Sequence, residues 1–129
     1  MTGHYRLIHV PSGHVAAVVV RAESWWAKGW GVLGHRILPV GEGLWLPGVA
    51  SIHTLGVRFP LDLLFLSGDF TCLRQVARLP PGCWNSRGVG AFHTLELGAG
   101  TLAQRVPMAE LGDRWLLERL PKEPKGPWL

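Results

Sequence analysis

Residues 61–66, which read LDLLFL, constrain the fold more than any other stretch of the chain. The run is apolar at odd and at even positions, which predicts a β-strand buried on both faces. The odd-numbered residues would share one face, and Asp62 would share the other with Leu64 and Leu66. The strand therefore places a carboxylate among leucines.

Asp62 stands at the entrance of this strand. Burying an unpaired charge costs several kcal/mol, which is comparable with the whole stability of a domain. We therefore expect Asp62 to accept backbone N–H groups from the preceding loop or to pair with a cation. Arg58 is the local candidate for that cation, because it lies four residues earlier in a turn that Pro60 shapes.

Further short apolar runs are separated by Gly- and Pro-containing turns, which is typical of a chain of short strands. The first two of them flank a Pro-Ser-Gly turn and predict a hairpin. The segment at 41–46 leads into the third. The predicted strands besides 61–66 are residues 5–10, 14–21, 50–54, 70–79, 91–97 and 113–118.

Two short helical segments complete the expected elements. Ser24 can cap a helix that runs to Trp30, and residues 101–105 predict a helical turn that Pro107 ends. We expect a single mainly β domain over residues 1–120, closed or nearly closed into a barrel or a sandwich, with one short helix. The Pro-rich residues 121–129 are expected to form an extended, mobile tail.

Composition narrows the class of protein. Of the 129 residues, 47% are hydrophobic and 17% charged, as in a folded domain rather than a disordered chain. No apolar run approaches the ~20 residues of a membrane helix. The longest, at 15–20, lacks the basic leader and cleavage site of a secretory signal, so we expect a cytoplasmic protein without a membrane partner. Asparagine and glutamine are scarce, which fits a thermophile or a GC-rich genome.

Charge and cysteine content disfavour several partners. The net charge of +4 is spread along the chain, without a basic arm or a basic run interleaved with aromatics, which disfavours nucleic-acid binding. Cys72 and Cys83 lack the spacing of zinc ligands and are too few for a disulfide framework. We expect no metal and no cofactor, and the sequence leaves the oligomeric state open.

The best candidate site is the stretch SIHTLGVRFPLD at 51–62. His53, Arg58 and Asp62 would converge at one mouth of the sheet, giving a cation for an anionic ligand, a carboxylate and a histidine that titrates near neutral pH. Thr54 belongs to the same stretch. Glu96 either faces solvent or reaches Arg58. In the alternative interpretation, Arg58 and Asp62 only hold the loop closed while His53 bonds a backbone group.

Two functions remain open on these residues. The first is a non-catalytic binding or accessory module for a small anionic or polar ligand. The second is a small hydrolase-like enzyme that uses His53 as general acid or base, oriented by Asp62. Ser51 would complete the residue types of a triad, but no GxSxG elbow accompanies it. The binding module is our leading hypothesis.

Three motifs together resemble a known family: SIHTLGVRFPLDLLFLSGD, FHTLELGAGT and LGD at 111–113. They are similar to the domain-of-unknown-function 192 family of small bacterial and archaeal β domains, over roughly residues 22–117. The chain departs from the family pattern at Val57, at the turn 67–69 and at Gly98, where a proline is usual. The resemblance implies a fold and no established reaction. The corresponding positions are His53, Thr54, Arg58, Pro60, Asp62, Glu96, Gly100, Gly112 and Asp113.

Overall fold

The computed structural model describes residues 3–22, 38–52, 57–83 and 86–121. The helix expected at 24–30 and most of the expected tail lie outside these residues. No helix in the described part is long and apolar enough to cross a membrane. The elements in chain order are β1 (His4–His9), β2 (His14–Arg21), β3 (Glu42–Pro47), β4 (Ser51–Ile52), β5 (Leu61–Leu66), β6 (Cys72–Leu79), β7 (Ser86–Arg87), β8 (His93–Gly98), α2 (Thr101–Arg105) and β9 (Trp115–Arg119).

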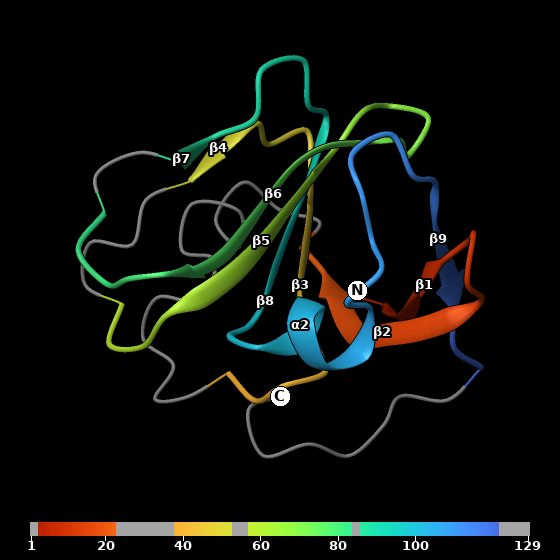
Figure 1. The fold of residues 1–129 in the computed structure, drawn as a ribbon, viewed down its shortest axis with the longest axis horizontal. Helices are drawn as coiled ribbons and strands as arrows, with labels where there is room; N and C mark the ends of the chain where they lie inside the picture. The colour runs from red at the N-terminus through yellow and green to blue at the C-terminus, as the bar shows by residue number, and fades with distance from the viewer. Residues whose placement is uncertain (1–2, 23–37, 53–56, 84–85, 122–129) are drawn as a thin grey trace.

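Seven of the strands form one sheet in the order β6-β5-β8-β3-β2-β1-β9, which curls into a half-barrel (Figure 1). The predicted hairpin is confirmed as the antiparallel pair β1–β2. β2 and β3 run parallel, whereas the other neighbours in this sheet are antiparallel. β4 and β7 make a second, two-stranded sheet. The prediction of a mainly β, barrel-like domain with a short helix is therefore confirmed.

The two edges of the curled sheet meet at one end. The Cys72 N–H donates to the Asp113 carbonyl at 2.8 Å, and the Trp115 N–H donates to the Phe70 carbonyl at 3.0 Å. Farther along β6, the Gln75 side chain donates to the carbonyl of Ala109 in the segment between α2 and β9. The start of β6 is thus tied to the start of β9, and the α2–β9 segment lies against β6.

Strand β5 is buried along its whole length, as predicted. Its even-numbered leucines, Leu64 and Leu66, pack in a cluster with Trp45, whereas Phe65 packs with Ile52 in a second cluster. The two apolar clusters lie on opposite faces of the sheet, because successive side chains of a strand point to opposite sides. Asp62 shares the face of Leu64 and Leu66.

Candidate functional site

Asp62 joins three segments of the chain. Its side chain is 0% exposed. Oδ1 accepts the backbone N–H of Arg78 in β6, and Oδ2 accepts that of Leu102 in α2, each at 2.9 Å. The expectation that Asp62 accepts backbone N–H groups is confirmed, but the donors come from β6 and α2 rather than from the loop before β5.

A bulge in β6 explains why Arg78 offers its N–H. Leu61 pairs with Leu79 and Leu63 with Val76, so two residues of β6 face the single residue Asp62. Arg78 adopts φ +52, the left-handed region, and its N–H leaves the regular ladder. The Asp62 carboxylate supplies the acceptor that the bulge removes.

The other predicted site residues are not gathered around Asp62. Arg58 is exposed, and within the described residues no hydrogen bond or ion pair joins it to Asp62 or Glu96. Glu96 is only 4% exposed, because β8 lies inside the sheet between β3 and β5. The expectation that Glu96 faces solvent is wrong. His53 and Thr54 lie outside the described residues.

Sequence reasoning missed a group of donors at the end of the sheet where β8 passes into α2. A Cβ atom at Gly100 would lie 3.2 Å from Nε2 of Gln104 and 3.3 Å from Nη2 of Arg78. A Cβ atom at Gly41 would lie 2.9 Å from Nη2 of Arg105. The two glycines are neighbours, since the Gly41 N–H donates to Oγ1 of Thr101 at 3.0 Å. N–H donors of three side chains therefore lie over the neighbouring Gly41 and Gly100.

This end of the sheet is rich in positive charge. Arg58 precedes β5, whose first residue pairs with the last residues of β6 and β8 and so begins at the same end (Figure 1). We call Arg58, Arg78, Gln104 and Arg105 the arginine end; all four residues are exposed. In the described part of the chain, no ion pair joins any of its arginines to a carboxylate.

His93 is a buried neutral histidine in an aromatic setting. Its Nδ1 accepts the indole N–H of Trp45 at 3.0 Å, and its ring stacks on Phe70 with centroids 4.3 Å apart. Burial lowers the pKa of His93 below 6.5; the Arg21 charge adds to this effect, and a hydrogen bond with the Gly68 backbone opposes it. The ring serves as a core hydrogen-bond partner.

We expect His93 to make stability fall between pH 7 and pH 5. The unfolded chain binds a proton at this histidine more readily than the folded chain, so the stability it contributes is complete above 6.5 and is lost as pH falls from there toward the lowered pKa. His93→Gln should show a shallower fall in the urea midpoint over this range. Parallel profiles for the two proteins would show that His93 is not the group responsible.

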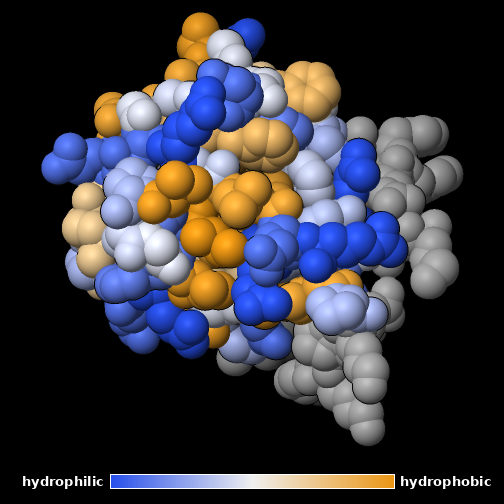
Figure 2. Space-filling model, turned by 90° about the vertical axis from the view of Figure 1, so that its right-hand side faces the viewer, coloured by the Kyte–Doolittle hydropathy of each residue, from blue (hydrophilic) through white to orange (hydrophobic). Residues whose placement is uncertain are grey.

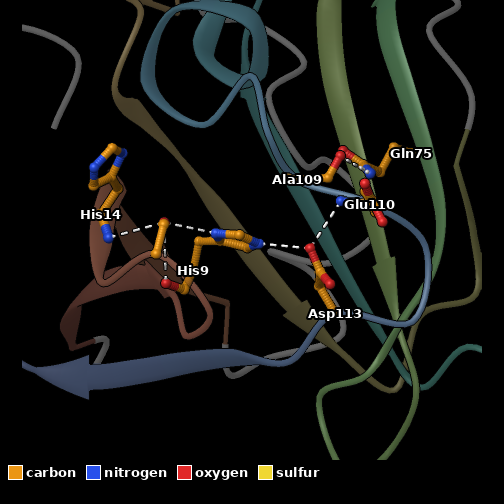
Figure 3. A network of polar contacts seen from close by, with 7 residues as sticks. His9, His14, Gln75, Ala109, Glu110 and Asp113 are labelled. Carbon is orange, nitrogen blue, oxygen red and sulfur yellow. Dashed lines mark hydrogen bonds and ion pairs between the residues drawn. The ribbon is translucent and has the colours of Figure 1, made fainter.

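A second polar network connects the β1–β2 turn to the start of β9 (Figure 3). Nδ1 of His9 lies 2.7 Å from Oγ of Ser12, and Nε2 of His9 lies 2.7 Å from Oδ2 of Asp113. Oδ2 of Asp113 also accepts the Glu110 N–H at 2.8 Å. Two sequence signals bear on this network: His9 is a polar residue at an inward position of an alternating strand, and Asp113 belongs to the LGD motif at 111–113.

Comparison with known proteins confirms the fold. No family model matches the chain, and no curated protein matches it. A structure from Sinorhizobium meliloti, described as a "putative transcription regulator", is 22% identical with a TM-score of 0.76 and covers 91% of this chain and 94% of that chain. A protein of unknown function from Novosphingobium aromaticivorans is 20% identical with a TM-score of 0.72, covering 88% and 83%. At these identities the likeness shows a shared fold alone.

Proposed function

We propose that the protein is a binding or accessory module that holds a small anionic ligand at the arginine end. The observation that carries this proposal is the convergence of N–H donors from Arg78, Gln104 and Arg105 above two adjacent glycines. Guanidinium groups bind carboxylate and phosphate oxygens through charge-assisted, often bidentate hydrogen bonds. The glycines supply close access, because they carry no Cβ atom beneath the donors.

Asp62 supports the site without competing for the ligand. It is buried beneath the arginine end, and both of its oxygens are engaged by the backbone N–H groups of Arg78 and Leu102. It fixes the backbone at the bulge and at the first turn of α2, from which Arg78, Gln104 and Arg105 project. Such rigid support lowers the conformational-entropy cost of binding a ligand.

The hydrolase-like alternative is less favoured by this geometry. It requires Asp62 to orient His53, whereas each Asp62 oxygen already accepts a backbone N–H at 2.9 Å. Asp62 thus has a sufficient structural role, and the leading hypothesis needs no acid–base group. A ligand that is only held requires charge and shape complementarity.

Membership of the domain-of-unknown-function 192 family and a cytoplasmic location belong to the same proposal. Several positions of the family pattern have specific local roles: Asp62 at the junction, Asp113 on His9, and the left-handed residues Gly100 and Gly112 at φ +92 and +87. Cys72 is a buried free thiol, as is usual in a reducing compartment. Homologous sequences that keep these residues would support membership of this family.

We expect the protein to bind inorganic phosphate saturably in isothermal titration calorimetry at low ionic strength. Arg78→Gln should weaken binding about tenfold, because it removes one charge-assisted contact worth about 1.4 kcal/mol. Arg119→Gln is the matched control, since Arg119 is also exposed but lies on β9. Absence of saturable binding by the wild type, or an equal loss in both variants, would refute the site.

A further inference from the structure

The Ser12–His9–Asp113 network has the residue types of an acyl-transfer relay. The ring nitrogens have exchanged partners relative to the usual Ser-His-Asp arrangement, because Ser12 meets Nδ1 and Asp113 meets Nε2. It lies at the β1–β2 turn and the start of β9, on elements that contribute no residue to the arginine end. We infer that Ser12 is a nucleophile, activated by His9 and Asp113, for ester substrates. This activity goes beyond the proposed anion binding and does not depend on it.

The hydrogen bonds assign the proton positions that such a relay needs. The bond from His9, supported by the Glu110 N–H, holds the pKa of Asp113 below its ordinary value, so Asp113 is a carboxylate at neutral pH. A carboxylate accepts only, which places the His9 proton on Nε2. In the neutral imidazole, Nδ1 is then the acceptor that faces the Ser12 hydroxyl at 2.7 Å, and this form of His9 is oriented as a general base. The same hydroxyl lies 3.5 Å from the His9 carbonyl oxygen.

The base is held rigidly. The His9 side chain is 1% exposed, and its ring packs at a tilt against Trp115 with centroids 5.0 Å apart. Asp113 is fixed in turn by the N–H of Glu110. A base fixed by packing and by a hydrogen-bonded carboxylate avoids the reorganisation that would slow proton transfer.

The nucleophile lies at the surface beside apolar side chains. Ser12 is half-buried, Val10 is 49% exposed and Val15 is 39% exposed. Val15 pairs with Ile8 across β2 and β1, and Ile8 pairs with the exposed Leu116 of β9. Figure 2 views this side of the molecule and shows apolar side chains gathered among hydrophilic ones. Strand alternation places Ile8, Val15 and Leu116 on the face of the sheet opposite His9, so Val10 is the exposed apolar side chain nearest in sequence to the nucleophile.

The turn also offers a donor for the oxyanion. The Gly13 N–H is used by the His9 carbonyl and the His14 N–H by Oγ of Ser12. The N–H of Ser12 itself makes no hydrogen bond to another residue of the described segments. In Ser-His-Asp enzymes the N–H of the nucleophile is one of the oxyanion donors.

The reaction needs no further reagent than water. Oγ of Ser12 attacks the ester carbonyl carbon while its proton passes to Nδ1 of His9. The same proton then moves to the leaving alkoxide as the bond between the carbonyl carbon and the alkoxy oxygen breaks, which leaves an acyl-Ser12. A water molecule gives its proton to Nδ1 and attacks this acyl group, and Ser12 regains the proton as the carboxylic acid departs.

The test is to treat the full-length protein with a fluorophosphonate probe, digest it and map the adduct by mass spectrometry. We expect the adduct on Ser12 and loss of labelling in Ser12→Ala. In Asp113→Asn the labelling rate should fall at least about 100-fold, because the neutral amide no longer favours the required tautomer of His9. Ser67→Ala, which removes a half-buried serine of the turn between β5 and β6, should label like the wild type.

Melting curves of each variant separate loss of reactivity from loss of fold, and guanidinium-unfolded wild type should lose the label. The test stays valid if Asp113→Asn does not fold. Unfolding the wild type also removes the relay, and it leaves Ser12 itself unchanged. An unlabelled wild type, an adduct on another serine, or equal labelling of folded and unfolded chains would overturn the inference. So would an unchanged rate in a folded Asp113→Asn protein.

Discussion

Replacing Asp62 by asparagine is expected to lower the free energy of unfolding by about 2–4 kcal/mol. The asparagine keeps the shape of the side chain but turns one acceptor oxygen into an NH₂ group. That group would face the backbone N–H of either Arg78 or Leu102, both now held at 2.9 Å, so two donors would meet inside the core. Urea unfolding followed by circular dichroism measures the loss.

Glu118→Gln is the matched control for this substitution. It also removes a carboxylate, but Glu118 is exposed and pairs with Arg6 at the surface, at 3.4 Å. Exposed pairs contribute about 0–1 kcal/mol, so its midpoint should hardly move. If Asp62→Asn unfolds at the same urea concentration as the wild type, Asp62 is not the structural junction described above.

Replacing Gly98 by alanine is expected to cost about 3–5 kcal/mol, or to prevent folding. The new Cβ atom would lie 2.0 Å from the carbonyl oxygen of Pro39 and 2.4 Å from its carbon. Both atoms belong to the backbone, so no side-chain rotation can relieve the contact. The close approach explains why residue 98 is a glycine.

Gly68→Ala provides the comparison for the second substitution. No atom outside the neighbouring residues lies within 4 Å of a Cβ at Gly68. The free energy of unfolding of Gly68→Ala should therefore stay within about 0.5 kcal/mol of the wild-type value. Both variants add one methyl group to a glycine, and they differ only in the space available. Equal stability of Gly98→Ala and Gly68→Ala would contradict the packing of residue 39 against β8.

The strands could be predicted from the sequence because their signals are local. Alternation and turn residues located β1, β2 and β5, and the double-sided apolar pattern of β5 showed that Asp62 would be buried and need partners. The two-residue strand β7 has no signal in the sequence, since so short a segment has no periodicity. Local patterns thus predict most of the elements, and they predict that the buried Asp62 needs hydrogen-bond partners.

The partners in the site could not be predicted, because they are distant along the chain. Asp62 binds residues 16 and 40 positions away, and His9 meets Asp113 across 104 positions. Sequence proximity therefore favours Arg58 as the partner of Asp62. The observed donor at Arg78 depends on a bulge that only strand pairing reveals. Glu96 was misjudged for the same reason, since alternation along β8 does not show that both its faces are covered.

The central claim is that the Asp62 junction presents the arginine end to a small anion, and a titration with inorganic phosphate followed by ¹H–¹⁵N NMR tests it most directly. We predict saturable shifts at the Gly41 and Gly100 amides and at the Gln104 side-chain amide, which surround the converging donors. In Arg78→Gln these shifts should reach half-saturation at about tenfold more phosphate, and in Arg119→Gln at the wild-type concentration. Shifts that do not saturate, or that centre on β9 instead, would contradict the claim.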